Sequence, residues 1–117
     1  MLDAVAWIAP GFEIVQSHFP GWKFTSADCT AAFGLHRALV VGPRIPLTDA
    51  SRDAYAASLP TFELTLRRGE AVVERGVGAN VLDSPALALA HLARVLADLP
   101  AMPPLAAGRL VTTGTET

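Results

Sequence analysis

The clearest pattern along the chain is a helical one over residues 85–98. Apolar side chains recur there at intervals of three and four, which places them on one face of a helix. This stripe consists of Leu89, Leu92, Val95, Leu96 and Leu99. The opposite face carries His91, Arg94 and Asp98. Ser84 is suited to cap the N-terminus and Pro85 suits the first helical position. The spacing predicts a helix that buries Leu89, Leu92 and Leu96 against a sheet.

The segment 61–76 is predicted to form a β-hairpin. Its first half, 61–67, alternates apolar and polar residues with a period of two, as a half-buried strand does. The side chains expected to face inward are those of Phe62, Leu64 and Leu66. The chain turns at Arg68-Gly69 and returns as a second strand over 71–75. Gly76 and Gly78 indicate a bulge or a close backbone approach just beyond it.

Shorter signals predict the remaining elements. Three short apolar runs favour strands, namely 12–16, interpreted as buried, 35–42 and 109–113. Two segments favour helix. Residues 3–9 are expected to form the last turns of a helix that stops at Pro10-Gly11. Residues 27–33 are expected to form a short helix that Thr25 or Ser26 can cap. The rest is predicted to be irregular, with a turn at Pro20-Gly21 in 17–25 and a crossing loop over 43–60 that contains a short turn of helix at 51–57.

These elements together predict a single α+β domain over residues 1–117. The chain begins inside an apolar, helix-like run without a cap and stops at Thr117, directly after a predicted strand and turn. A compact domain usually ends in a polar tail or a docked element. We therefore expect this domain to be truncated at both ends.

Composition and charge exclude several functional classes. Hydrophobic residues make up 51% of the 117 residues and charged residues 17%, which is incompatible with a disordered tail. The net charge of −2 gives no electrostatic support for nucleic-acid binding. No apolar run approaches the ~18 residues of a membrane helix, and the N-terminus lacks the basic start of a signal peptide. With one cysteine, Cys29, the chain has no intrachain disulfide. These observations predict a cytoplasmic domain that binds neither nucleic acid nor membrane.

Glu13 and Lys23 are the first candidates for chemistry. Glu13 stands in an apolar strand, where a buried carboxylate needs a cation, a donor or a proton. A glutamate at a strand edge with its carboxylate in water is an equally good interpretation. Lys23, the single lysine, follows Trp22 and could bind a substrate carboxylate as a point charge. An exposed lysine beside a packed tryptophan explains the same residues.

Other candidates carry weaker signals. Asp28 is a second carboxylate that could help Glu13 bind a hard cation. The turn Thr112-Thr113-Gly114-Thr115 offers hydroxyls and backbone amides to a carboxylate or phosphate, although such turns are common in ordinary hairpins. His36 and His91 have no partner nearby in the sequence and are interpreted as structural. Cys29 lies in an apolar context and is interpreted as a core residue.

An ordered set of motifs resembles one known family. The set consists of Ile-Ala-Pro-Gly-Phe-Glu-Ile-Val-Gln-Ser-His, Gly-Trp-Lys-Phe, Ala-Leu-Val-Val-Gly, the 61–76 hairpin, Gly-Ala-Asn-Val-Leu-Asp-Ser-Pro and Leu-Val-Thr-Thr-Gly-Thr. In this order they resemble the 2-keto-4-pentenoate hydratase and 4-oxalocrotonate decarboxylase group of the fumarylacetoacetate hydrolase superfamily. The resemblance extends from about Ala9 to Thr115.

The resemblance implies a fold and a site. The fold would be the mixed β-roll of the fumarylacetoacetate hydrolase C-terminal type. Three carboxylates hold Mg²⁺ or Mn²⁺ in this family, two from a Glu-x-Glu strand and the third at the position of Glu13. The metal acts as a Lewis acid on a 2-oxo acid, which then adds water or loses carbon dioxide. Lys23 matches a catalytic lysine or arginine, and Gly114 and Thr115 match a loop that lines the substrate pocket.

The sequence also departs from the family pattern. No Glu-x-Glu occurs in these 117 residues, and the second aspartate of a family Asp-Thr-Val-Ala-Asp motif is replaced by Ala32. Two hypotheses follow. In the first, the chain is part of a metal-dependent hydratase or decarboxylase that acts on a small 2-hydroxy-dienoic or 2-oxo acid, with a missing N-terminal half or a homo-oligomer completing the site. In the second, it is a non-catalytic fragment or paralogue that retains the fold core and the oligomer surface.

Overall fold

The structure is a computed structural model that describes residues 2–114. Within these residues it consists of short helices and two-stranded antiparallel sheets, so the predicted α+β class is confirmed. The chain divides into two compact units, each described here by itself. One is Trp7–Pro46, and the other combines Met1–Ala6 with Leu47–Thr117.

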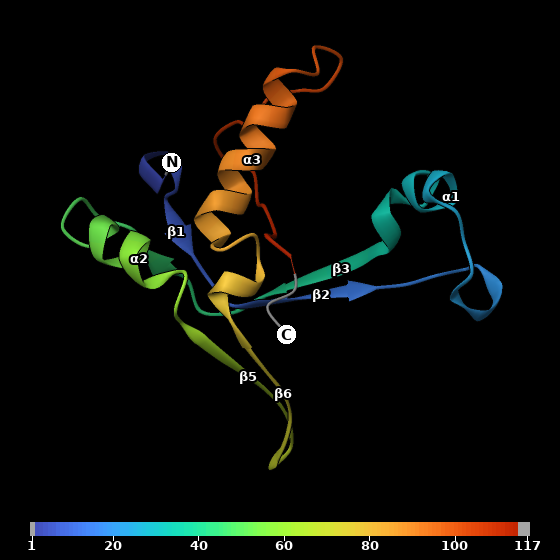
Figure 1. Cartoon of the computed structure of the whole chain (residues 1–117), viewed down its shortest axis with the longest axis horizontal. Coiled ribbons are helices and arrows are strands. Elements are labelled where there is room, and N and C mark those ends of the chain that lie inside the picture. The colour runs from blue at the N-terminus through green and yellow to red at the C-terminus, as the bar shows by residue number, and fades with distance from the viewer. Residues whose placement is uncertain (1, 115–117) are drawn as a thin grey trace. The chain divides into compact units, whose positions relative to one another are not determined.

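The unit Trp7–Pro46 is built on a β-ribbon. Strand β2 (Gly11–Val15) pairs antiparallel with β3 (His36–Val41), and the two strands run side by side in Figure 1. The ribbon continues into a second short ladder of β1 (Trp7–Ile8) with β4 (Ile45–Pro46). Both strands predicted at 12–16 and 35–42 are therefore present.

The predicted burial of the first strand is wrong. All five residues of β2 are exposed, and Phe12 keeps 57% of its surface in solvent. Val40, which lies opposite Phe12 in β3, is 55% exposed. A short, mostly apolar run predicts a strand, but only a second layer can bury its side chains, and a two-stranded ribbon does not supply that layer.

A short helical segment connects the two strands of the ribbon. It contains η2 (Pro20–Trp22), α1 (Ser26–Ala31) and η3 (Phe33–Leu35). Thr25 caps α1 through a capping box, so the predicted short helix is present, starting one residue earlier than expected and ending two residues earlier. Leu35 is buried, and its carbonyl accepts a hydrogen bond from the Gln16 amide at 2.8 Å.

The helix expected over 3–9 is not formed. Only a 3-10 turn, η1 (Leu2–Ala4), is helical, and the chain then enters β1. Trp7 and Ile8 pair with Pro46 and Ile45 within the segment expected to be a loop. Aromatic and β-branched residues shortly before a proline favour extended backbone, and the partner strand completes their hydrogen bonds.

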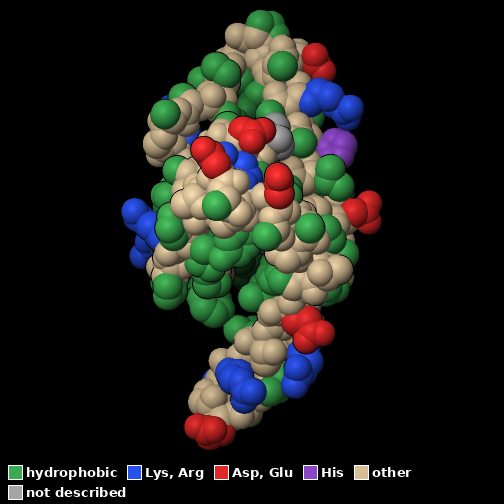
Figure 2. Space-filling view, turned by 90° about the vertical axis from the view of Figure 1, so that its left-hand side faces the viewer, with side chains coloured by type: hydrophobic (Ala, Val, Ile, Leu, Met, Phe, Trp, Pro, Cys, Tyr) green, Lys and Arg blue, Asp and Glu red, His purple; other side chains and the backbone are tan. Residues whose placement is uncertain are grey.

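The other unit contains the predicted hairpin. Strand β5 (Glu63–Arg68) pairs antiparallel with β6 (Ala71–Val77), and Gly69 begins the two-residue turn with φ +60°, as a type II′ turn requires. Phe62, Leu64 and Leu66 are half-buried while the residues between them are exposed, so the predicted alternation is confirmed. Figure 2 shows basic and acidic side chains gathered on this hairpin.

Gly78 follows the hairpin at a close approach, as the glycine pattern indicates. It opens η4 (Gly78–Asn80), and its amide donates to the Phe62 carbonyl at 3.0 Å. A Cβ added to Gly78 would lie 2.6 Å from Cε1 of Phe62 and would overlap the Leu59 carbonyl. The bulge itself lies at Leu66/Arg67 rather than at Gly76.

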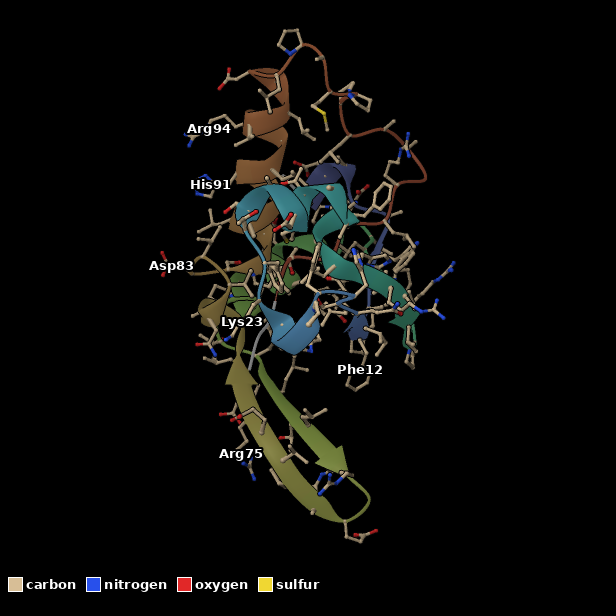
Figure 3. The ribbon with its side chains drawn as sticks, turned by 90° about the vertical axis from the view of Figure 1, so that its right-hand side faces the viewer. Phe12, Lys23, Arg75, Asp83, His91 and Arg94 are labelled. Atoms are coloured by element: carbon tan, nitrogen blue, oxygen red, sulfur yellow. The ribbon has the colours of Figure 1, made fainter. Side chains whose placement is uncertain are left out.

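The predicted helix is α3 (Pro85–Ala97), with α2 (Arg52–Ser58) matching the turn expected at 51–57. Ser84 caps α3 by accepting a hydrogen bond from the Ala86 amide at 3.3 Å. Of the predicted stripe, Leu89, Leu92 and Leu96 are half-buried, whereas Val95 and Leu99 are exposed. Burial of the stripe is therefore partial. His91 and Arg94 project together from the outer side of this helix (Figure 3).

The strand predicted over 109–113 is not formed. This segment carries no regular structure, and no strand of the described residues pairs with it. A β-branched run becomes a strand only when another strand completes its backbone hydrogen bonds. The core of this unit is formed by Leu2, Leu47, Leu59 and Val81. Among the described residues, no helix is long and apolar enough to cross a membrane.

Candidate functional site

Glu13 and His36 bring two chemistry-bearing side chains into contact across the β2–β3 ribbon. Nδ1 of His36 lies 2.9 Å from Oε1 of Glu13. The His36 side chain is 45% exposed and the Glu13 side chain 37%, so solvent reaches both. Glu13 is therefore a strand glutamate with its carboxylate at the surface and an imidazole beside it.

A β-bulge brings these two side chains to one face. Glu13 lies opposite Leu39 and Ile14 opposite Ala38, but Val15 pairs with His36 instead of residue 37. Arg37 is thus an extra residue in β3. In an unbroken ladder His36 would project to the face opposite Glu13, because side chains alternate along a strand. The bulge re-aims His36 so that it reaches the carboxylate.

Lys23 lies in the same unit, on the aromatic loop between β2 and α1, and Figure 3 shows it there with Phe12 on the ribbon. The Trp22 and Phe24 rings flank it in sequence, with centroids 6.5 Å apart, and Phe24 also contacts Phe19. Trp22 has φ +58°, a left-handed backbone that is strained for a bulky residue. Lys23 is exposed, and no carboxylate of the described residues forms an ion pair with it.

Asp28 takes part in capping α1 and does not assist Glu13. Its Oδ2 accepts hydrogen bonds from the amide and the hydroxyl of Thr25, both at 2.9 Å. These bonds, first that of the Thr25 amide and then that of the Thr25 hydroxyl, hold the pKa of Asp28 below its ordinary value. The carboxylate expected to assist a cation site is therefore engaged in local structure.

The expected substrate loop falls at the edge of the described residues. Gly114 is exposed and has φ +113°, a conformation that favours glycine. It belongs to the unit that contains α3, whereas Glu13 and Lys23 belong to the other. Thr115 lies outside the described residues.

The contact between His36 and Glu13 is the feature that the sequence interpretation missed. The two residues are 23 positions apart in the sequence, so neither has the other as a local neighbour. The sequence signal that could have revealed the contact was antiparallel pairing of the strands predicted at 12–16 and 35–42. Such pairing brings the end of the first strand near the start of the second. His91, also interpreted as structural, lies 3.4 Å from Arg94 on α3, and Cys29 is a half-buried free thiol.

The described residues do not complete a magnesium site. No group of three or more His, Cys, Asp or Glu side chains among residues 2–114 is placed to hold a metal ion. Mg²⁺ is held in octahedral geometry by oxygen ligands, several of them water. Glu13 supplies a carboxylate, and the adjacent donor is a nitrogen.

Comparison with known proteins identifies similar sequences. The chain is 32% identical over 115 residues to 2-keto-4-pentenoate hydratase 2 of Dechloromonas aromatica (strain RCB), a match that covers 97% of the chain. It is 34% identical over 114 residues to 2-keto-4-pentenoate hydratase 3 of Pseudomonas putida, and 35% identical over 97 residues to 2-hydroxyhexa-2,4-dienoate hydratase of Comamonas testosteroni. The chain is related to the 2-keto-4-pentenoate hydratases.

The similarity to these hydratases has a defined extent. The chain spans 40% of the length of the Dechloromonas protein, 39% of the Pseudomonas protein and 34% of the Comamonas protein. No family model and no solved structure matches the chain. The resemblance stated from the motifs is confirmed by sequence similarity along nearly the whole chain.

Proposed function

We propose that this chain is a hydratase-like domain that takes part in adding water to a small 2-hydroxy-dienoic or 2-oxo acid. The observation that carries the proposal is similarity to named hydratases over 97% of the chain. In the reaction the oxygen of water bonds to one carbon of a double bond and a proton bonds to the conjugated system. The mixed β-roll of the fumarylacetoacetate hydrolase type, with Mg²⁺ or Mn²⁺ as cofactor, belongs to the same proposal.

Lys23 is the residue proposed to bind the acid. Its side chain is exposed, stands between Trp22 and Phe24 in the sequence and forms no ion pair with a carboxylate of the described residues. A compact positive charge of this kind attracts a carboxylate, and the neighbouring rings offer apolar surface to a conjugated chain. Gly114 and Thr115 keep their proposed role in substrate binding, which rests on the family resemblance.

Glu13 is proposed to act at the metal position, with its carboxylate as one of the oxygen ligands. Since no group of three or more candidate metal ligands occurs among the described residues, further ligands would come from outside those residues. We derive no reaction step through the metal from this chain. A homo-oligomer, or a partner that supplies the remaining part of a hydratase, is accordingly part of the proposal.

A non-catalytic role is the second candidate. The observation that favours it is the exposed apolar face of the β2–β3 ribbon, which includes Phe12, Ile14 and Val40. Such a face suits an interface between subunits. A paralogue without activity would keep this face if it still assembled with other subunits.

The test is an activity assay that separates the two candidates. Loss of the ultraviolet absorbance of 2-hydroxypenta-2,4-dienoate is followed with the chain alone and with a co-expressed polypeptide that carries the remaining part of a hydratase relative. Turnover in either case that disappears in Glu13→Gln and Lys23→Met supports the hydratase. Absence of turnover from a complex shown to assemble favours the non-catalytic role.

A further inference from the structure

The outer edge of strand β5 has no partner strand among the described residues. The β5–β6 hairpin extends away from α2 and α3 of the same unit (Figure 1). The Gly78 amide donates to the Phe62 carbonyl at 3.0 Å, so this carbonyl points toward β6. Backbone groups alternate in direction along an antiparallel strand. Those of Glu63, Thr65 and Arg67 therefore point away from β6, and no backbone hydrogen bond from elsewhere in residues 2–114 reaches them.

An edge of this kind is a template for a further strand. A row of unpaired N–H and C=O groups accepts another extended chain, and many proteins prevent this with lysine, proline or a bulge on the edge strand. Strand β5 spans six residues and contains neither lysine nor proline. The bulge of the hairpin lies on β6, where Val73 is the extra residue, so β5 itself stays regular. The edge is thus open to pairing.

The charges along this edge complement those of a second copy. Glu63 and Arg67 lie on either side of Thr65, and all three side chains are exposed on one face of β5. In an antiparallel pairing centred on Thr65, Glu63 of each copy lies opposite Arg67 of the other. Neither residue forms an ion pair with another described residue. On the other face the half-buried Leu64 lies opposite Leu66.

The same register satisfies the backbone of both copies. Residues whose backbone groups point outward must lie opposite each other to exchange hydrogen bonds. Thr65 opposite Thr65, and Glu63 opposite Arg67, meet this condition. A shift of one residue would bring outward-pointing groups opposite groups that point toward β6. Among the registers that the backbone permits, this one places unlike charges opposite each other, so it is the favoured one.

We propose that β5 is a homodimerisation edge, at which the β5 strands of two copies pair antiparallel about a two-fold axis at Thr65. The pairing joins the two hairpins into one sheet, and additional strands stabilise a hairpin that is marginal by itself. The interface is isologous, since the same residues contribute from both copies. The inference rests on the proposed function only for the expectation of a homo-oligomer, because the edge contains no residue of the candidate site.

Charge exchange between two positions provides the test. Glu63→Arg and Arg67→Glu each place like charges opposite each other in a homodimer, whereas the double variant restores unlike charges. An equimolar mixture of the two single variants restores them as well, because each Glu63→Arg chain can then pair with an Arg67→Glu chain. Glu70→Arg at the hairpin turn and Arg94→Glu on α3 are the matched controls. Every chain carries Phe12→Thr to suppress association through the β2–β3 ribbon, and circular dichroism checks the fold.

Analytical ultracentrifugation measures the dimer dissociation constant. We expect each single variant to weaken dimerisation at least tenfold. The double variant, the equimolar mixture and the two controls should dimerise like the chain with its original charges. A monomer at high concentration in the chain with its original charges overturns the inference. So does a mixture of the single variants that dimerises no better than either variant alone.

A cysteine cross-link tests the register. In a Cys29→Ser chain, which lacks the native thiol, Thr65→Cys lies on the two-fold axis, where opposite Cα atoms are about 5.5 Å apart and within disulfide range. Glu63→Cys is the control, because its two copies are about 13 Å apart along the strands. We expect mild oxidation to yield a disulfide dimer of Thr65→Cys, and a dimer of Glu63→Cys in its place would contradict the register.

The readout is assembly and not turnover, so the two proposals fail separately. A chain that shows hydratase turnover but does not pair through β5 removes this interface alone. A chain that pairs through β5 but shows no turnover in an assembled complex removes the proposed function alone.

Discussion

Gly78 lies so close to Phe62 that no side chain fits between them. The Gly78 amide donates to the Phe62 carbonyl at 3.0 Å, and a Cβ at this position would stand 2.6 Å from the Phe62 ring. This contact seats the end of the β5–β6 hairpin against the end of α2. The absence of a side chain at residue 78 is therefore a structural requirement.

Gly78→Ala should destabilise the chain by about 1–3 kcal/mol or more, since the added methyl overlaps the Leu59 carbonyl as well as the ring. The free energy of unfolding from urea titration measures the effect. Gly69→Ala is not a suitable control because its φ is positive. Ala79→Gly, at an exposed neighbour, is suitable. Equal stability of Gly78→Ala and the parent chain would contradict the close packing.

Leu92→Ala should cost about 1–2 kcal/mol in the free energy of unfolding. A fully buried leucine costs about 2–5 kcal/mol, but Leu92 is only half-buried on α3. Val95→Ala provides the comparison, because Val95 is 50% exposed and should lose less than about 0.5 kcal/mol. Chemical denaturation distinguishes the two. A reversed order would mean that the other face of α3 is the packed one.

Acid should weaken the N-terminus of α1. The pKa of Asp28 is lower in the folded chain than in the unfolded one, so the folded state binds this proton less readily. The resulting stability is present above the ordinary aspartate pKa of about 3.9 and is lost as the pH falls through the folded value. Thermal unfolding between pH 5 and pH 2 follows this loss.

The capping residue provides the matched variants for that experiment. Thr25→Val removes the hydroxyl that bonds Asp28, whereas Thr25→Ser retains it. We expect Thr25→Val to lower the stability at pH 6 and to flatten the acid dependence, and Thr25→Ser to behave like the parent chain. An acid dependence that is identical in all three proteins would exclude the Thr25 hydroxyl as its source, because the Thr25 amide is present in each of them.

The chain should self-associate through the apolar face of the β2–β3 ribbon. Phe12 and Val40 lie opposite each other and are both more than half exposed. Burying them against a second copy removes apolar surface from water, and two-stranded ribbons are marginal without a covering layer. Sedimentation should show association that decreases in Phe12→Thr. A monomer at high concentration in the parent chain would rule this surface out.

Local patterns predicted the elements whose signals are complete within a few residues. The hairpin at 61–76 follows from its period of two and from Gly69, and α3 follows from its leucine spacing, its Ser84 cap and Pro85 at its first position. The motifs that carry the family resemblance are local as well, which is why similarity to the hydratases could be anticipated. In these cases a segment's own backbone hydrogen bonds or turn geometry determine the outcome.

Tertiary pairing decided the rest. Residues 3–9 became a turn and a strand because Pro46 and Ile45 were available as partners, and 109–113 stayed irregular because no described strand pairs with it. The contact between Glu13 and His36 depends on a bulge at Arg37 that no local pattern marks. The register of two strands that are distant in the sequence is set by many weak cross-strand contacts at once. The sequence alone therefore does not reveal that Glu13 and His36 lie in contact.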